Sequence, residues 1–302
     1  MGEGGARQVS VDALYEQVRK AVPVSEGTVP AELLPVGPGI RVLALRTPTL
    51  PPAAHTNVYV VGPDTGPQLV VDPGSPYPDQ QAILDAALER EASAGRPLGG
   101  VLLTHHHGDH VGGAQALATR YSVPIAAHRR TVERLRGRVE VARELVDNET
   151  FDGITCVFTP GHADGHLVFE RDGAQIAGDM VAGIGTILID PSEGDMADYL
   201  ASLARMLERA PALLLPAHGP PIADAAGKLR EYIAHRTMRE DRVVAALNAH
   251  ADASVDELVP IVYADTPRML WPLAGRSLRA HLDKLVKEGR AREVGPGRWT
   301  TR

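Results

Sequence analysis

Residues 104–110 read Thr104-His105-His106-His107-Gly108-Asp109-His110 and place four imidazoles and one carboxylate within six positions. They follow the apolar run 101–103, which is typical of a buried strand. Alternation along an extended loop turns His105 and His107 one way and His106 the other, while Asp109 and His110 lie at the turn into a helix. Zinc accepts neutral imidazole nitrogen and carboxylate oxygen at about 2.0–2.2 Å. The stretch therefore predicts a metal site that can serve two neighbouring ions.

Three more segments with ligand-type side chains also follow predicted strands. They are 159–166 after the strand 154–158, 178–179 after 175–177, and 216–219 after 212–215. Side chains at strand ends converge on one edge of a layered sheet, where functional sites are commonly built. A surface histidine tract, the alternative for the first segment alone, does not account for all four.

At these residues the chain resembles the metallo-β-lactamase superfamily, whose HxHxDH motif and later His, Asp and His it matches in order over about residues 40–221. The resemblance implies an α/β fold, a four-layer αββα sandwich. It also implies two Zn²⁺ ions, with Mn²⁺ or Fe²⁺ as alternatives. One ion would be held by His105, His107 and His162, the other by Asp109, His110 and His218, with Asp179 bridging both.

Single positions distinguish branches of that superfamily. The best-known zinc β-lactamases carry Cys where Asp179 stands, and the only cysteine here, Cys156, lies six residues before His162. Flavin-linked di-iron oxidoreductases carry Glu where His107 stands. Antibiotic hydrolysis and redox chemistry are therefore disfavoured. Glyoxalase II shares all seven ligands, so a thioesterase stays open.

The C-terminal half resembles the beta-lactamase-like protein 2 branch in segments 179–183, 198–203, 216–220 and 232–240. Proteins of that branch carry a winged-helix-like domain after the hydrolase domain. Its animal members are similar to endoribonucleases that act on single-stranded RNA, and its bacterial members are largely uncharacterised hydrolases. The resemblance therefore implies a metal-dependent hydrolase and favours an endoribonuclease-like phosphodiesterase that acts on RNA, although it is a poor guide to the substrate.

Helical and strand-like patterns divide the chain into three parts. We predict an N-terminal helix and irregular lead-in (1–38), the αββα domain (39–224) and a small helical winged-helix-like domain (225–302). The last part has helical apolar spacing over 228–250, 254–263 and 278–288, then a hairpin. Ser254 and Glu257 form a capping-box pattern. Within the αββα domain we expect a helix or lid over 129–149 and a strand over 186–189.

Two zinc ions about 3.5–4 Å apart would lower the pKa of a shared water, so that a zinc-bound hydroxide exists at neutral pH. Asp109 is then the predicted catalytic residue, because it can bind metal and accept the water proton. A structural metal site in a nucleic-acid-binding regulator is the non-enzymatic alternative. Structural zinc sites are normally closed by four protein ligands, whereas seven ligands around two ions leave room for water, which favours an enzyme.

Four further residues are candidates for supporting roles. Asp72 follows the strand 69–71 and is expected to orient a ligand imidazole, although an Asp before Pro also forms turns. His166 would orient a ligand or contact substrate, or else be a structural histidine. His235 and Arg236 would lie at the cleft mouth or form an interdomain contact.

Charge and composition limit which substrates and partners are expected. The 302 residues carry 31 Lys and Arg against 38 Asp and Glu, a net charge of −7, which favours a small ester, thioester or lactone substrate over RNA. Residues 268–302, with nine basic and three acidic side chains, are the one segment that predicts RNA contact. The alternatives for this segment are a solvated face, a lid or a dimer contact.

Location is predicted from what the sequence lacks. It has no run of about 18 apolar residues, and residues 1–10 have no apolar region typical of a signal peptide. A single cysteine fits a reducing compartment. We therefore expect a cytoplasmic protein without membrane contact, whose oligomeric state, a dimer included, the sequence leaves open.

Overall fold

The computed structural model describes residues 11–22 and 30–302. Residues 1–10, on which the prediction about secretion depends, lie outside the described residues, as do residues 23–29 of the predicted lead-in. The N-terminal helix is α1 (Val11–Ala21). Its Val18 is buried, and Arg19 Nη1 donates a hydrogen bond to the Pro48 carbonyl at 2.9 Å. These contacts attach α1 to the rest of the chain.

Two β-sheets form the centre of the larger domain. The first sheet has the spatial order β1 to β7, antiparallel from β1 to β4 and parallel from β4 to β7. Its strands are β1 (Leu34–Gly37), β2 (Ile40–Arg46), β3 (His55–Val61), β4 (Gln68–Val71), β5 (Leu98–Leu102), β6 (Ile125–His128) and β7 (Arg143–Leu145). The second sheet has the order β12-β11-β10-β9-β8. Its strands are β8 (Thr150–Phe151), β9 (Ile154–Phe158), β10 (Leu167–Arg171), β11 (Ala174–Gly178) and β12 (Leu213–Pro216).

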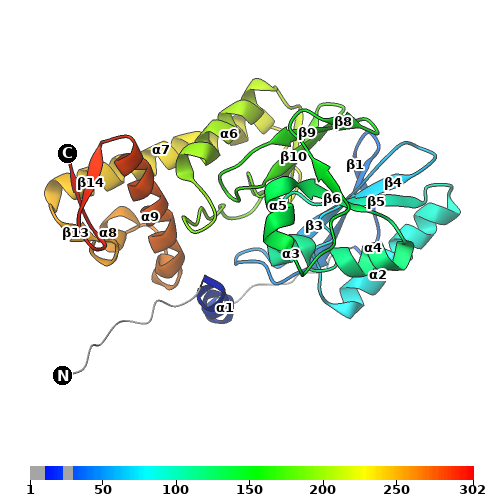
Figure 1. Cartoon of the computed structure of the whole chain (residues 1–302), viewed down its shortest axis with the longest axis horizontal. Helices are drawn as coiled ribbons and strands as arrows, with labels where there is room; N and C mark the ends of the chain where they lie inside the picture. Colours follow the sequence, from blue (N-terminus) through cyan, green and yellow to red (C-terminus); the bar gives the residue numbers. More distant parts are fainter. Residues whose placement is uncertain (1–10, 23–29) are drawn as a thin grey trace.

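Helices cover the outer faces of both sheets (Figure 1). Those that follow strands of the first sheet are α2 (Pro78–Ser93), α3 (Gly108–Val111), α4 (Ala114–Tyr121) and α5 (Arg129–Leu135). The second sheet is covered by α6 (Met196–Glu208) and the start of α7 (Ala225–Ala249).

Alternating side chains of β3 separate two cores. Val58 and Val60 pack in the cluster that contains Leu88 of α2, whereas Tyr59 packs in the cluster that contains Phe169 of β10. Successive residues of a strand point to opposite faces, so the first sheet has helices on one side and the second sheet on the other. A third cluster joins Val168 of β10 to α6 and α7. The layers are therefore αββα, and the predicted fold is confirmed.

The C-terminal residues form a helical unit with a three-stranded sheet. It lies at the opposite end of the long axis from α2 and α4 (Figure 1). Its elements after α7 are β13 (Ala253–Ser254), α8 (Val255–Val262), η1 (Arg268–Leu270), α9 (Trp271–Lys287), β14 (Ala291–Gly295) and β15 (Arg298–Thr301). Ser254 and Glu257 form the predicted capping box at α8. Trp299 is buried among α7, α8 and α9.

Three local predictions were wrong. The helix predicted from residue 129 ends at Leu135, and the chain continues to β7, because Leu145 completes the edge of the first sheet beside His128. Residues 186–189 form no strand, although Ile187 and Ile189 are buried. Residues 34–37, assigned to the irregular lead-in, form β1 against β2.

Among residues 11–22 and 30–302, no helix combines the length and apolar character that crossing a bilayer requires.

Candidate metal centre

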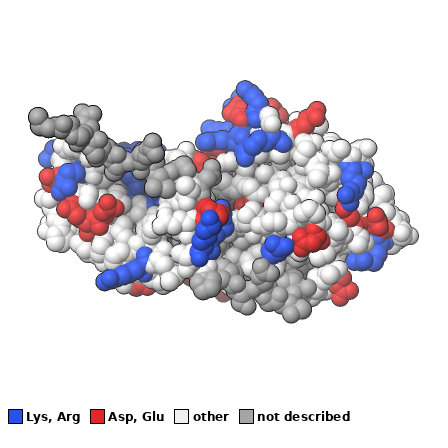
Figure 2. All heavy atoms as spheres, turned by 90° about the horizontal axis from the view of Figure 1, so that it is seen from below, with Lys and Arg blue, Asp and Glu red and all other residues white. Residues whose placement is uncertain are grey.

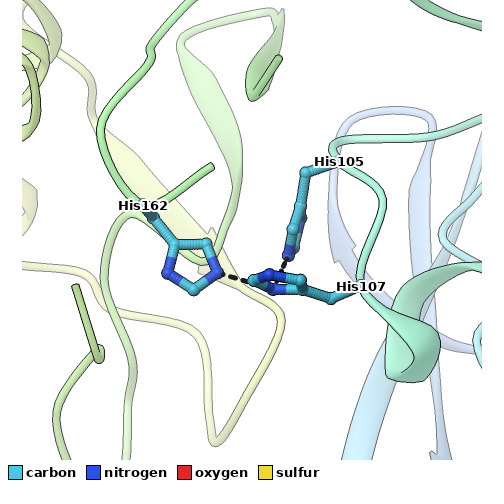
Figure 3. Close-up of side chains that lie close together, drawn as sticks. All are labelled: His105, His107 and His162. Atoms are coloured by element: carbon cyan, nitrogen blue, oxygen red, sulfur yellow. Dashed lines mark hydrogen bonds between the residues drawn. The ribbon is translucent and has the colours of Figure 1, made fainter. Parts of the chain in front are cut away.

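Three imidazoles converge on one point between the two sheets. His105 and His107 lie in the loop that joins β5 to α3, and His162 lies in the loop between β9 and β10. His107 Nδ1 is 2.9 Å from both His105 Nε2 and His162 Nε2 (Figure 3). Ligand atoms of a tetrahedral zinc site are about 3.3 Å apart, so these nitrogens are spaced as one cation requires.

A second set of ligand atoms lies beside the first. It consists of Asp109 and His110 in α3 and His218 after β12, and their ligand atoms lie within 4.8 Å of one another. His218 Nε2 is 3.6 Å from Asp109 Oδ2, and His110 Nε2 is 4.0 Å from the same oxygen. Two nitrogens and one oxygen are a donor set that zinc, manganese and iron(II) accept.

Asp179 stands between the two sets. It follows β11 directly, its Oδ2 is 3.6 Å from His162 Nε2, and its Oδ1 is 3.3 Å from His218 Nε2 and 3.5 Å from His110 Nε2. One oxygen therefore faces each set, as a bridging carboxylate does. The structure thus brings together all seven side chains that the sequence predicted as ligands.

Local backbone geometry explains how the segments approach so closely. Gly178 has φ +50°, and a Cβ there would lie 2.5 Å from His166 Nε2. A Cβ on Gly74 would lie 1.8 Å from the Asp109 carbonyl oxygen. Only glycine fits both positions, because the chain must pass directly against the ligand loops.

Each imidazole of the two sets is held through its second nitrogen, which fixes the tautomer that leaves the first nitrogen free for metal. Asp72, which the sequence offered as an orienting residue, has its Oδ2 2.8 Å from His110 Nδ1. Asp72 also accepts hydrogen bonds from the backbone and hydroxyl of Thr104, whose Oγ1 is 3.0 Å from His105 Nδ1. The Asp72 carboxylate therefore supports both sets.

Backbone carbonyls and one further carboxylate hold the other rings. His162 Nδ1 donates to the Leu188 carbonyl at 2.8 Å, and His218 Nδ1 to the His55 carbonyl at 3.0 Å. His107 Nε2 is 2.8 Å from Glu193 Oε1. These partners were not predicted from the sequence. Carbonyls carry no residue-type signal, and Glu193 lies in an irregular segment far along the chain from the motif.

Electrostatics favour the metal-binding forms of the carboxylates. Burial alone would raise the pKa of Asp179, but His218 and His110 hold it well below its ordinary value. Burial likewise opposes ionisation of Asp109, yet His110 and His218 lower its pKa. Burial lowers the pKa of His162 to about 4, so that ring is neutral near pH 7. A neutral imidazole and ionised carboxylates are the forms that bind metal.

The same carboxylates act on the rings of the second set. Burial would lower the pKa of His110, but Asp179, Asp72 and Asp109 raise it well above its ordinary value. His110 Nε2 and Asp179 Oδ1 are buried and have no hydrogen-bond partner among the described residues. Two buried polar atoms that face each other without a partner are costly. A cation between them would satisfy both, so the residues present fit a metal.

His166 and His106 lie beside the ligands without joining either set. His166 is buried, its Nδ1 is 2.9 Å from Thr159 Oγ1, and its Nε2 accepts a hydrogen bond from the Asp179 backbone N–H at 3.2 Å. It therefore positions Asp179. His106 turns away from the ligand cluster and its Nε2 contacts Glu193 Oε2 at 2.9 Å.

The two candidates on α7 lie in a different environment. Arg236 is buried, donates a hydrogen bond to the Ile187 carbonyl and packs over the Tyr199 ring. Burial and the adjacent Arg236 lower the pKa of His235 to about 4. These contacts join α7 to the segment near Leu188, and none of them reaches a ligand side chain.

Comparison with known proteins agrees with this architecture. The model of the Metallo-beta-lactamase superfamily matches residues 51–218, and that of the Beta-lactamase associated winged helix domain matches residues 254–299. A Beta-lactamase-like protein 2 homolog from Drosophila melanogaster is 29% identical over 273 residues, covering 84% of this chain and 89% of its own. An Atrochrysone carboxyl ACP thioesterase from Claviceps purpurea is 32% identical over 224 residues, covering 70% and 67%.

Solved structures agree as well. A beta-lactamase domain protein from Burkholderia ambifaria superposes with a TM-score of 0.76 at 25% identity, covering 92% of this chain and 96% of its own. A metallo-beta-lactamase family protein from Thermus thermophilus superposes with a TM-score of 0.72 at 24% identity, covering 88% of this chain and 99% of its own. The chain therefore belongs to the metallo-beta-lactamase superfamily and carries a beta-lactamase-associated winged helix domain at its C-terminal end.

Proposed function

We propose that this protein is a hydrolase with a binuclear metal centre that cleaves a carboxylic ester or thioester. The observation that carries the proposal is the position of Asp179, with one carboxylate oxygen toward each set of imidazoles. Zinc is the proposed metal, with manganese or iron(II) as alternatives. The first ion would be held by His105, His107 and His162, and the second by Asp109, His110 and His218, with Asp179 between them.

Two bound cations would supply Lewis acidity at the substrate carbonyl and lower the pKa of a water molecule. The side chains of the protein transfer the proton and orient the imidazoles. Asp109 is ionised and its side chain is 15% exposed, so it can take the proton of the attacking water and return it to the leaving alcohol or thiol. Asp72 and Glu193 keep their ligand rings in one orientation throughout.

The basic side chains of the winged helix domain are mostly paired with acidic ones, which favours an acyl substrate over RNA. Of the seven basic residues between 276 and 298, six form ion pairs with acidic side chains. These are Arg276, Arg279, Lys284, Lys287, Arg290 and Arg298. A phosphate backbone would have to displace those carboxylates. On the face in Figure 2, basic and acidic groups are interspersed, apart from one cluster of basic groups at the upper edge.

A relative with thioesterase in its name supports the same substrate class. Single-stranded RNA is the second candidate, favoured by the match to beta-lactamase-like protein 2 homologs along most of the chain and by the resemblance of that branch to endoribonucleases.

One screen separates the two substrate classes. Purified full-length protein is analysed for metal and assayed with an acyl thioester, p-nitrophenyl acetate and an unstructured RNA, each beside the Asp109→Asn variant. We expect about two zinc ions per chain and thioester or ester cleavage that the variant loses. If the protein cleaves RNA and neither acyl substrate, RNA replaces the ester or thioester as the proposed substrate. Two bound ions without turnover of any substrate would overturn the hydrolase itself.

We propose a cytoplasmic protein with one buried, unpaired cysteine, Cys156. Cell fractionation tests its location, and sedimentation of the purified chain decides between monomer and dimer.

A further inference from the structure

Glu193 links two neighbouring histidines of the motif to a distant segment of the chain. Its Oε1 is 2.8 Å from His107 Nε2 and its Oε2 is 2.9 Å from His106 Nε2. The Glu193 side chain is only 16% exposed, so its hydrogen bonds are largely shielded from water. Because His107 turns Nδ1 toward His105 and His162, Glu193 decides which nitrogen of His107 carries the proton and how the ring is turned.

The position of Glu193 is set by Asp190, three residues earlier. The Asp190 carbonyl accepts hydrogen bonds from the backbone N–H of Glu193 at 3.2 Å and of Gly194 at 2.7 Å. Asp190 Oδ1 accepts from the backbone N–H of Ser192 at 2.9 Å and from its hydroxyl at 2.6 Å. Asp190 therefore folds residues 190–194 into the turn that presents Glu193 to the imidazoles.

Asp190 is in turn held by the winged helix domain. Arg276 in α9 donates from Nε to Asp190 Oδ2 at 2.8 Å and from Nη2 to Asp190 Oδ1 at 2.6 Å. Asp190 is 2% exposed, and a two-pronged guanidinium–carboxylate pair fixes orientation as well as distance. Lys287, near the end of the same helix, pairs with Asp195. Two cations of α9 thus hold both ends of the segment that carries Glu193.

We propose that Glu193 is a positioning residue for the metal centre and that the winged helix domain sets its position through the Arg276–Asp190 pair. This inference rests on the proposed metal site. The C-terminal domain then acts on the His105, His107 and His162 set from outside the catalytic domain. This gives Arg276 a role other than contact with RNA.

Zinc affinity of the full-length protein, measured by competition with a chromophoric chelator, tests the proposal. We expect Glu193→Gln to weaken zinc binding by about 10-fold or more, as loss of such partners commonly does. Arg276→Gln should weaken it in the same direction by a smaller factor and add little in the Glu193→Gln background, because both act along one path. Arg298→Gln, which removes an exposed ion pair within the winged helix domain, is the matched control and should leave zinc affinity unchanged.

Two further measurements separate positioning from general destabilisation. The visible spectrum of the Co²⁺-substituted protein should change in Glu193→Gln, since it reports ligand geometry, while the melting temperature of metal-free protein should hardly move. If Arg276→Gln does not fold, Asp190→Asn breaks the same pair and keeps the acceptor for Ser192.

The outcomes are distinct. If the parent chain binds no zinc or cobalt, the proposed function fails. If it binds two ions and Glu193→Gln binds them with unchanged affinity and spectrum, this inference alone fails. If Arg276→Gln and Glu193→Gln have additive effects on zinc affinity, Arg276 does not act through Glu193, and the proposed role of the winged helix domain fails. His106, His107 and Glu193 also lie close enough together to hold an ion. If the parent binds a third zinc ion that Glu193→Gln loses, Glu193 is itself a ligand and the positioning role is overturned.

Discussion

Asp72 and His110 are joined at 2.8 Å, and this contact turns the opposite nitrogen of the ring toward Asp179, 3.5 Å away. Asp72 itself adopts φ +51°, a left-handed conformation that Asp and Asn tolerate better than other non-glycine residues. The carboxylate is therefore built into a bend of the chain after β4. Its position and its charge together set which nitrogen of His110 faces Asp179.

Asp72→Asn should weaken the second metal position while leaving the fold intact. Asn keeps the backbone conformation and the shape of the side chain but loses the charge that supports the His110 ring. We expect zinc affinity at this position to fall by about 10–100-fold. Chelator competition measures it, and Asp64→Asn, at an exposed loop position, is the control. An unchanged affinity would mean that the contact only stabilises the turn.

Asp109→Asn should remove the proton acceptor with little effect on the fold. Its carboxylate is ionised because His110 and His218 lower its pKa against the effect of burial. We expect turnover of any accepted substrate to fall by about 100-fold or more. Metal analysis of the same sample distinguishes loss of the base from loss of the second ion. Turnover at the parental rate with full metal content would exclude Asp109 as the proton acceptor.

The residue types and their order along the chain were enough to predict which seven side chains the structure brings together. His105, His162, Asp179 and His218 each follow a strand of the structure, because strands that end at one edge deliver their next residues to one place. The same pattern could not identify Glu193, whose segment has no regular structure and no repeating spacing. Its role depends on the long-range pair between Asp190 and Arg276.

The prediction of secondary structure was wrong where tertiary contacts override the local preference of the sequence. Residues 186–189 have the alternation of a strand, but they pack against α6 and α7 without a neighbouring strand, and the Leu188 carbonyl is used by His162 instead. Predictions from alternation cannot distinguish a paired strand from an extended segment whose hydrogen bonds go elsewhere.

His166→Ala should destabilise the protein through Asp179. The ring is neutral because burial lowers its pKa well below the ordinary value, and it accepts from the Asp179 backbone N–H. Removal leaves that N–H and the Thr159 hydroxyl unpaired, at a cost of about 1–3 kcal/mol. Denaturant unfolding of the metal-free protein measures the cost. A variant of parental stability with weakened metal binding would instead make His166 a ligand.

Glu240→Gln should change how stability depends on pH. Burial would raise the pKa of Glu240, but the His281 ring, 3.9 Å away, and hydrogen bonds from Lys284 and Arg290 lower it to about 2. A carboxyl whose pKa is lowered by folding stabilises the protein above its unfolded pKa of about 4.3 and loses that contribution as pH falls toward 2.

We therefore expect Glu240→Gln to be about 2 kcal/mol less stable than the parent at pH 7, with allowance for partial solvent screening. The difference should shrink between about pH 4.3 and pH 2. Denaturant titrations at several pH values measure it, and the exposed Glu208→Gln is the control. A difference that stays constant down to pH 2 would assign the loss to packing and not to charge.

Cys156 offers a direct probe of the core between the sheets. It lies in β9, is fully buried, and burial raises the pKa of its thiol to about 12. Because the thiolate is the reactive form, a thiol-specific reagent at pH 8 should label native protein only at the rate at which this core opens. In denaturant one thiol per chain should react at once. Added zinc should slow native labelling if the metal joins the two sheets through the loops that follow β5 and β9, whereas labelling that ignores zinc would place the metal outside that junction.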